Sequence, residues 1–277
     1  MASSKTESPS QLTSLAAARP GPAPGDNYVQ SFARGLEVIR SFSRQAPRQT
    51  ITEVAERTGL TRAGARRILL TLQTLGYVQS DGKLFSLTPR MLDLGFAYLS
   101  SLPIWNLAEP VMQTLVGQVR ESCSAAVLDG TDIVYVLRVP THKIMSITLG
   151  VGSRLPAYCT SMGRMLLSAL PEAELMHLLE TSDRQARTRF TVTGLEELAA
   201  RIAQVRQQGW AQVDQELEEG LISMAVPVTD RAGKTVAALN ISGQANRSSA
   251  KVMRETMLSP LLAAAQTISR MLSIQGS

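Results

Sequence analysis

Residues 61–75 read TRAGARRILLTLQTL, and at helical spacing this stretch has two distinct faces. One face is apolar and consists of Ala65, Ile68, Leu69, Leu72 and Leu75. The other carries small and guanidinium side chains near the N-terminal end, namely Arg62, Ala63, Arg66 and Arg67. Thr61 stands where an N-cap hydroxyl accepts from the first unpaired backbone N–H groups. Such a helix has the dimensions and charge to enter a DNA major groove; a surface helix with solvated arginines is the alternative.

The residues before this stretch predict two further helices. Residues 31–44 carry an apolar stripe formed by Phe32, Leu36, Ile39 and Phe42, with Val38 at its margin. Ile51–Arg57 predicts a short second helix, for which Thr50 and Glu53 have the spacing of a capping box. Ala55 permits close helix packing, and Gly59 allows the positive φ of a tight turn. Together these features predict a helix-turn-helix.

After Gly76 the apolar period changes from helical to two. Residues 77–79 and 84–87 flank the sequence Ser80-Asp81-Gly82-Lys83, and Asp-Gly at the tip is a strong hairpin signal. Three helices and a hairpin make a winged helix-turn-helix. Lys83 at the tip is a candidate contact to the DNA backbone, with an ordinary surface turn as the alternative.

The net charge of +5 is confined to this part of the chain. Residues 28–101 hold ten Lys and Arg against five Asp and Glu, whereas residues 102–277 hold sixteen of each. An excess restricted to one small segment is typical of a polyanion-binding domain joined to a neutral one. Residues 1–27 are rich in Ser, Ala, Pro and Gly and predict a disordered tail.

A linker helix is expected between the two domains. Thr88 and Pro89 provide an N-cap and a first helical residue, and residues 89–101 are apolar around most of the helix. A helix of this kind needs burial on more than one side, which predicts a contact with a second subunit. The expected organisation is a tail at 1–27, a DNA-binding domain at 28–88, a linker at 89–103 and a second domain at 104–277.

The second domain is predicted to be α+β, with an antiparallel sheet and helices packed on it. The expected helices are Leu107–Arg120, Ser161–Leu170, Pro171–Glu180, Leu195–Gln208 and Ser249–Ser273. The expected strands are Ser124–Asp129, Ile133–Val139, Ile144–Leu149, Trp210–Val213, Leu221–Val228 and Thr235–Ser242. Gly150–Thr160 is expected to be a loop.

The sequence matches the motifs of enzymes and of cofactor-binding proteins only weakly. Gly150-Val151-Gly152 lacks the third glycine of a dinucleotide loop, and two histidines without a Cys/His cluster predict no metal site. A small hydrolase using Ser161 and His142 is the rival interpretation, although no supporting motif surrounds either residue. The acidic run formed by Asp214, Glu216, Glu218 and Glu219 is expected to be a solvated turn. No leader or spanning segment is evident, and Cys123 and Cys159 are expected to be free thiols, so a cytoplasmic protein without cofactor or metal is predicted.

A binding pocket is better supported than a catalytic centre. The predicted loop at 150–160 leads into a helix that begins near Ser161, where free N–H groups of Ser161, Met162 and Gly163 would form an anion site. Ser223, Asn240 and Ser242 are polar residues on predicted strands, and the last two share one face. We interpret them as ligand-orienting groups; hydrogen bonding between strands and loops is the alternative for each.

Several strings resemble the IclR family of transcriptional regulators. They are YVQSFARG with LEVIRSF and ITEVAERTGLTRAGARRILLTLQTLGYV in the first domain, and RVPTHKIMSITLGVGSRLPAYCTSMGRMLL with GWAQVDQELEEGLISMAVPV in the second. The second pair is most similar to the subgroup that regulates protocatechuate and β-ketoadipate metabolism. The resemblance implies a PAS/GAF-like effector domain and a homodimer or dimer of dimers on partly palindromic operator DNA. It also implies that residues matching Ser161, Met162, Gly163, Ser223, Asn240 and Ser242 line the effector site.

The sequence therefore predicts a DNA-binding regulator of aromatic-acid catabolic genes, with activation expected over repression. The expected effector is a small organic acid such as protocatechuate, 4-hydroxybenzoate or β-ketoadipate. Arg138, His142 and Arg154 are candidate sources of positive charge for it. Thr61, Arg62, Ala63, Arg66, Arg67 and Lys83 are the expected DNA contacts, and RNA polymerase is a candidate partner. An architectural DNA binder with a ligand-free dimerisation domain is a third interpretation.

Overall fold

The computed structural model describes residues 25, 27–100, 104–141 and 149–275. The chain divides into two compact units, one within Pro20–Leu102 and the other built from Pro103–Ser277. Within the described residues, no helix has the length and apolarity that crossing a membrane requires. Each unit is considered by itself below.

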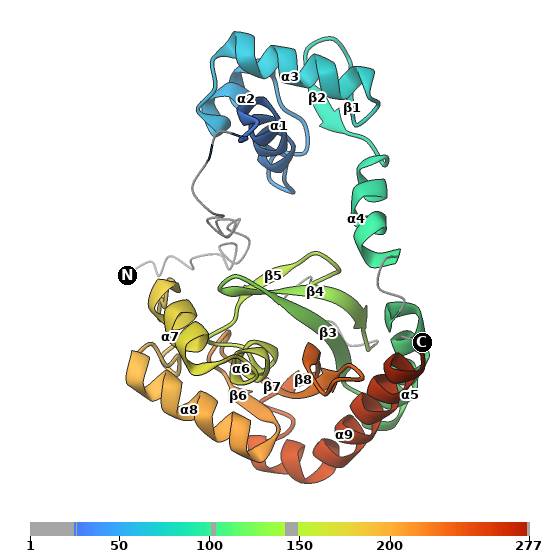
Figure 1. Ribbon diagram of the computed structural model, residues 1–277, viewed down its shortest axis with the longest axis vertical. Helices are drawn as coiled ribbons and strands as arrows, with labels where there is room; N and C mark the ends of the chain where they lie inside the picture. Colours follow the sequence, from blue (N-terminus) through green and yellow to red (C-terminus); the bar gives the residue numbers. More distant parts are fainter. Residues whose placement is uncertain (1–24, 26, 101–103, 142–148, 276–277) are drawn as a thin grey trace, which may run out of the picture. The chain divides into compact units, whose positions relative to one another are not determined.

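The first unit contains three helices and a hairpin, followed by one more helix (Figure 1). Its elements are α1 (Gln30–Ser41), α2 (Ile51–Thr58), α3 (Arg62–Thr74), β1 (Val78–Ser80), β2 (Phe85–Leu87) and α4 (Met91–Ser100). The small core is formed by apolar residues from α1, α2, α3 and the hairpin, among them Val54, Ala65, Leu69 and Phe85. The winged helix-turn-helix expected from the sequence is confirmed.

Local capping explains where these helices begin and end. Glu53 N–H donates to the Thr50 hydroxyl, and Thr50 N–H donates to the Glu53 carboxylate at 2.7 Å, completing the predicted capping box. The hydrogen bond from the Thr50 N–H to this carboxylate, followed by the one from the Thr50 hydroxyl, lowers the pKa of Glu53. Gly59 ends α2 with a φ of 65°, a conformation that favours glycine. The Thr61 hydroxyl accepts from Gly64 N–H at 3.1 Å and caps α3.

The expected apolar stripe of α1 is partly wrong. Val38, placed at its margin, is fully buried, whereas Phe32 is 69% and Leu36 is 38% exposed. The helix carries two apolar faces, because Val38 and Leu36 are two positions apart and point in nearly opposite directions. Only the face of Val38 meets α2 and α3. Leu75, expected on the buried side of α3, is likewise half exposed at the end of that helix.

The start of α4 also differs from the expectation. The helix begins at Met91, and the Thr88 hydroxyl donates to the Gly76 carbonyl oxygen at 2.6 Å instead of capping α4. The predicted apolar surface is present, since Leu92, Leu94 and Phe96 are each at least half exposed. Within its own unit α4 therefore leaves these side chains uncovered.

One pairing of the first unit was not predicted. Gln49 forms an antiparallel bridge with Phe85, in which each backbone N–H donates to the other's carbonyl oxygen at 2.7 and 2.9 Å. Gln49 is buried and belongs to the segment before α2. This bridge ties that segment to β2 and so to the wing.

The second unit is a six-stranded antiparallel sheet with strand order β5-β4-β3-β8-β7-β6. The strands are β3 (Ser122–Asp129), β4 (Asp132–Val139), β5 (Arg154–Pro156), β6 (Ala211–Asp214), β7 (Leu221–Thr229) and β8 (Thr235–Gln244). The helices are α5 (Ile104–Val119), α6 (Ser161–Ser168), α7 (Glu172–Thr181), α8 (Leu195–Gln208) and α9 (Ala250–Gln275). The α+β class and the antiparallel sheet are confirmed.

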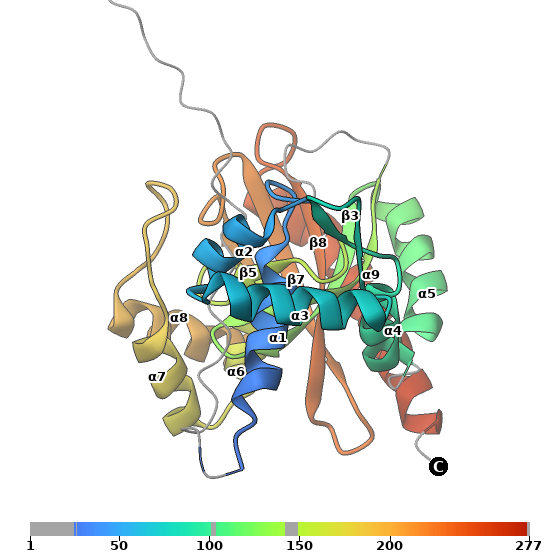
Figure 2. The same ribbon diagram turned by 90° about the horizontal axis from the view of Figure 1, so that it is seen from above.

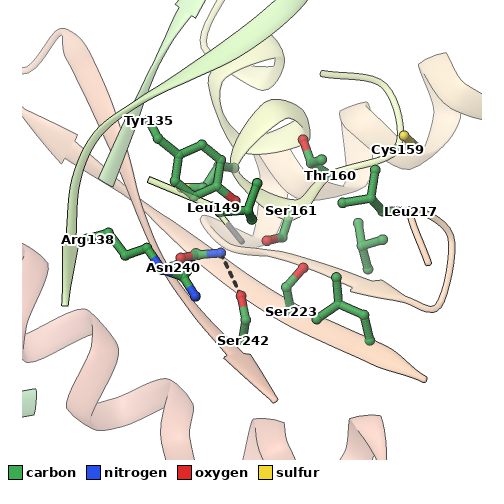
Figure 3. A pocket seen from close by; sticks show the side chains of 13 residues that line it. Tyr135, Arg138, Leu149, Cys159, Thr160, Ser161, Leu217, Ser223, Asn240 and Ser242 are labelled. Atoms are coloured by element: carbon green, nitrogen blue, oxygen red, sulfur yellow. Dashed lines mark hydrogen bonds between the residues drawn. The ribbon is translucent and has the colours of Figure 1, made fainter. Parts of the chain in front are cut away.

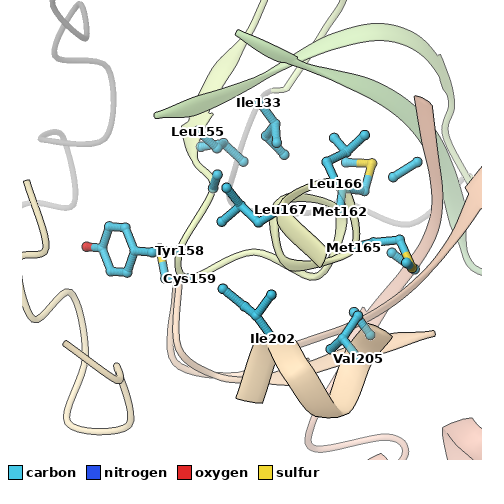
Figure 4. Close-up of a cluster of buried hydrophobic side chains, with 14 of the residues drawn as sticks. Ile133, Leu155, Tyr158, Cys159, Met162, Met165, Leu166, Leu167, Ile202 and Val205 are labelled. Atoms are coloured by element: carbon cyan, nitrogen blue, oxygen red, sulfur yellow. The ribbon is translucent and has the colours of Figure 1, made fainter. Parts of the chain in front are cut away.

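Helix α6 occupies the concave side of the curled sheet (Figure 1). Helices α7 and α8 lie on that side, and α5 and α9 pack against each other on the opposite side (Figures 1 and 2). All eight residues of α6 are buried, in a cluster with side chains of β4, β5 and α8 such as Ile133, Leu155, Ile202 and Val205 (Figure 4). The helix is thus the centre of the unit.

Two expectations for the middle of this unit need comment. Residues 150–160, expected to be a loop throughout, contain the short strand β5, which pairs with β4. Its side chains alternate only once, so the period-two signal is too short to see in the sequence. The predicted strand Ile144–Leu149 lies almost wholly outside the described residues, as do most of the predicted tail and His142.

Replacing Thr50 by alanine should lower the free energy of unfolding of the first unit by about 1 kcal/mol, because the α2 capping box is lost. The measurement is urea denaturation of the full chain. Thr74→Ala is the matched control, since Thr74 is exposed near the end of α3 and caps no helix start. An equal effect of the two substitutions would contradict a stabilising role for the cap.

Candidate functional site

The exposed face of α3 carries the basic residues identified from the sequence. Arg62, Ala63, Arg66 and Arg67 are all exposed, as is Thr61. Among the described residues, none of these three arginines forms an ion pair with a carboxylate. Their guanidinium groups are therefore available to an external acceptor such as a phosphate oxygen or a base edge.

The wing is stiffened by Asp81. Backbone N–H groups of Lys83 and Leu84 donate to the Asp81 carboxylate, and Arg48 forms an ion pair with it. These backbone hydrogen bonds, followed by the Arg48 charge, lower the pKa of Asp81. Gly82 has a φ of 100°, as the turn requires. Lys83 is left exposed at the tip.

The second unit contains a cavity between the start of α6 and the sheet (Figure 3). It is lined by Tyr135, Arg138, Leu149, Cys159, Thr160, Ser161, Met162, Val213, Leu217, Leu221, Ser223, Asn240 and Ser242. The lining comes from β4, the end of the segment that enters α6, and strands β6, β7 and β8. Polar and apolar groups thus converge on one enclosed space.

Five of the six residues predicted for a pocket line this cavity, and Gly163 does not. The N–H of Gly163 donates to the Thr160 hydroxyl at 3.1 Å, so it is not free for a ligand. A Cβ at Gly163 would overlap the backbone of Ala157. This glycine is therefore needed for the close approach of α6 to the preceding segment.

A hydrogen-bonded chain fixes one side of the cavity. The Asn240 side-chain oxygen accepts from Ser124 N–H at 3.1 Å, and its amide nitrogen donates to the Ser242 hydroxyl at 3.0 Å. Arg138 approaches the Ser124 hydroxyl at 3.5 Å. Asn240 and Ser242 therefore form hydrogen bonds within the sheet, as the alternative interpretation expected. The Arg138 guanidinium still has N–H donors left for a ligand.

Ser161 lies opposite this chain and has an unusual environment. Its side chain is 1% exposed, and its hydroxyl has no hydrogen-bond partner among the described residues. Figure 3 shows it directed into the space that Tyr135, Asn240 and Ser223 also face. An unpaired buried hydroxyl is costly, so a ligand group that bonds to it would be stabilised.

The cavity is narrow in this conformation. Its volume of about 20 Å³ is room for roughly one water. Met162 forms part of the wall, and its flexible thioether side chain can change rotamer at modest cost. An organic acid therefore requires the wall to move on binding.

Burial also changes the acid–base chemistry of the lining. It raises the pKa of Cys159 to about 11 and that of Tyr135 to about 12, so both groups are neutral at physiological pH. A nucleophilic role for the Cys159 thiol is disfavoured because the thiolate is scarce. Neither residue was identified as a pocket group from the sequence, although Tyr135 lies two positions after Ile133 on a predicted strand and so shares its face.

Two charged groups are placed differently from the expectation. Arg154 pairs with Asp129 at 2.7 Å and with Asp132 at 3.3 Å, away from the cavity lining. Glu216, expected in a solvated turn, is buried and bonded to the guanidinium of Arg164. Burial raises the pKa of the neighbouring Glu218. A local run of acidic letters cannot reveal a partner that lies 52 positions away.

A winged helix-turn-helix unit followed by an antiparallel-sheet unit with an enclosed polar cavity defines a class, the ligand-responsive transcriptional regulators. Residues 31–82 match the family model for the IclR helix-turn-helix domain, and residues 96–270 match the model for the bacterial transcriptional regulator IclR C-terminal domain. The chain belongs to the IclR family. It is a regulator and not an enzyme, which removes the hydrolase alternative.

Comparison with individual relatives shows which members of the family this chain is similar to. The chain is 45% identical to the Pca regulon regulatory protein of Pseudomonas putida, over 87% of this chain and 84% of that protein. It is 35% identical to the p-hydroxybenzoate hydroxylase transcriptional activator of Acinetobacter baylyi, over 86% and 89%. It is thus close to regulators of aromatic catabolism.

Two solved structures share the fold. Protein RHA06195 of Rhodococcus sp. RHA1 is 50% identical with a TM-score of 0.80, covering 88% of this chain and 98% of that one. The inducer-binding domain of Acinetobacter PobR, a double mutant in complex with 3-hydroxybenzoic acid, is 29% identical with a TM-score of 0.56, covering 60% and 97%.

The buried thiols give a prediction about pH. At pH 8 a pKa of about 11 leaves roughly one Cys159 in a thousand ionised, so a disulfide reagent should react very slowly with the folded chain. Since the folded-state pKa lies above the ordinary value of 9.0, stability present below pH 9 should be lost as the pH rises towards about 11. Thiol titration before and after unfolding in guanidinium measures how slowly the folded chain is labelled. Rapid labelling of the native chain would contradict it.

Proposed function

We propose that this chain activates transcription of aromatic-acid catabolic genes by binding operator DNA through its first unit and a small carboxylic acid through the cavity of its second. The observation that carries the proposal is the cavity in which the Arg138 guanidinium faces the same space as the Ser161 hydroxyl, which has no partner among the described residues. The similarity to the Acinetobacter baylyi activator of p-hydroxybenzoate hydroxylase supports the gene class and the activating role.

The proposed DNA interface is the N-terminal half of α3 together with the wing. Arg62, Arg66 and Arg67 would contact bases or phosphates, and Ala63 would allow close approach to the groove. Thr61 and Lys83 would contact the backbone. The absence of carboxylate partners for these arginines among the described residues supports this role, because a guanidinium engaged on the protein would have to be released first.

The proposed effector is an aromatic or dicarboxylic acid, with protocatechuate, 4-hydroxybenzoate and β-ketoadipate as the candidates. Arg138 would bind a carboxylate, and Ser161 with Ser223 would bond a second polar group. Asn240 and Ser242 would fix the orientation, and Met162 would form the apolar wall. The 3-hydroxybenzoic acid in the related PobR domain supports a ligand of this class.

We also propose that the chain acts as a homodimer or a dimer of dimers. The uncovered apolar side chains of Phe32 on α1 and of Leu92 and Phe96 on α4 support a contact with a second copy, because solvated apolar patches of this kind mark interfaces. A paired copy would place two α3 helices on a partly palindromic operator in the cytoplasm. RNA polymerase is the proposed partner for activation.

Arg66→Ala should weaken binding to an operator duplex by about 1–3 kcal/mol if Arg66 reads a base, which is roughly 5- to 150-fold. The duplex is selected from a random library with the wild-type chain, and affinities are compared at one salt concentration. Arg231→Ala is the control, because it removes the same charge from an exposed turn of the other unit. Equal affinities for the two variants would remove Arg66 from the interface.

Ser161→Ala should weaken acid binding by about 1 kcal/mol, roughly fivefold, without lowering thermal stability, because the hydroxyl has no partner to lose within the described part of the chain. The three candidate acids are screened by thermal shift and then by calorimetry. Ser168→Ala is the control, since that hydroxyl donates to Met165 at the far end of α6.

If none of the acids binds or changes operator affinity, the sensor proposal is wrong. An architectural DNA-binding role would then be favoured.

A further inference from the structure

We propose that the buried ion pair between Arg164 and Glu216 is a positioning pair for the cavity. It holds three separate lining segments in one geometry and thereby sets the affinity for the acid. The choice of ligand rests on the proposed function, whereas the positioning role rests on the contacts described next.

The pair has the geometry of a two-pronged fork. Arg164 Nη1 donates to Glu216 Oε1 at 2.7 Å, and Nη2 donates to Oε2 at 2.6 Å. The two side chains are 2% and 6% exposed. Two parallel charge-assisted hydrogen bonds in a buried site fix both distance and orientation.

Arg164 holds two of the lining segments. Its Nε donates to the Tyr158 carbonyl oxygen at 2.9 Å, immediately before Cys159 and Thr160, which line the cavity. Its own backbone N–H donates to the Thr160 carbonyl oxygen at 3.0 Å within the first turn of α6, the turn that presents Ser161. One side chain therefore ties the entering segment to the helix.

Glu216 holds the third segment, the connection between β6 and β7. It is followed directly by Leu217, which lines the cavity, as does Leu221 at the start of β7. Glu216 is itself held in place, since Val192 N–H donates to its carboxylate at 3.0 Å and the Thr191 hydroxyl donates to its carbonyl oxygen at 2.6 Å. Glu216 is thus held by Arg164 on one side and by Thr191 and Val192 on the other.

The chemistry of the pair favours a positioning role over a purely stabilising one. Removing two charges from water is expensive, and apolar replacements of similar volume often leave stability unchanged or increase it. What apolar side chains cannot supply is the directional fork. A cluster of apolar side chains packs around α6 (Figure 4), and such packing is not directional. The fork adds a directional link between the first turn of α6 and the connection between β6 and β7.

The test compares the full-length double variant Arg164→Met/Glu216→Leu with Arg206→Met. The double variant removes both charges together and leaves no buried ion unpaired. Arg206 is the matched control because it donates to Ser168 and Leu170 at the other end of α6, each at 2.7 Å. Amide hydrogen exchange is measured without ligand, and 4-hydroxybenzoate, protocatechuate and β-ketoadipate are titrated by calorimetry.

We expect the double variant to remain folded, to exchange amides faster in residues 157–164 and 215–222, and to bind the acids at least tenfold more weakly. The control should leave both regions and the acid affinities near the wild-type values. Unchanged exchange in the two regions, or unchanged acid affinity, would overturn the proposal. If the wild type binds none of the acids, the proposed effector class fails while the exchange comparison still decides the positioning role.

Arg164→Lys keeps the charge but loses the fork. This single variant is used in place of the double variant if the double variant does not fold. The expected result is an intermediate, several-fold loss of acid affinity with the same two regions loosened. Wild-type exchange and affinity in Arg164→Lys would show that charge alone suffices and would also overturn the proposal.

Discussion

The complete burial of α6 is the constraint on which the second unit depends. Every residue of this helix is buried, so its polar ends and its one charged side chain must find partners inside the protein. Thr160 satisfies the first turn, Arg206 satisfies the Ser168 carbonyl at the last turn, and Glu216 balances Arg164. The Ser161 hydroxyl has no such partner among the residues that the structure describes, and it faces the cavity. The same requirement that organises the fold therefore marks the place for a ligand.

The sequence allowed prediction of features determined by neighbouring residues. The capping box at Thr50, the turn at Gly59 and the cap at Thr61 all follow from local spacing, and the structure has them. It also pointed to Ser161 and Asn240, which line the cavity. Their binding roles stay predictions.

What could not be predicted depends on contacts between distant residues. Glu216 belongs to an acidic run, and only the fold brings Arg164 to it. The exposed face of α1 has a similar cause, since Phe32 and Val38 are equally apolar letters and only packing decides which is covered. Gly163 is predicted as a ligand-binding residue from its place at a helix start and from the family resemblance, yet it does not line the cavity. Contact with Ala157 gives it a different role.

The division of charge between the units fits the proposed regulator. The net positive charge lies within residues 28–101, which include α3 and the wing, and the cavity lies in a unit with balanced charge. An acid can alter DNA binding only if it has different affinities for two conformations of the chain. The direct test is therefore reciprocal linkage: the affinity for a bound acid is measured with and without saturating operator. The account predicts that it changes by the same factor by which the acid changes operator affinity; equal acid affinities in both states would contradict it.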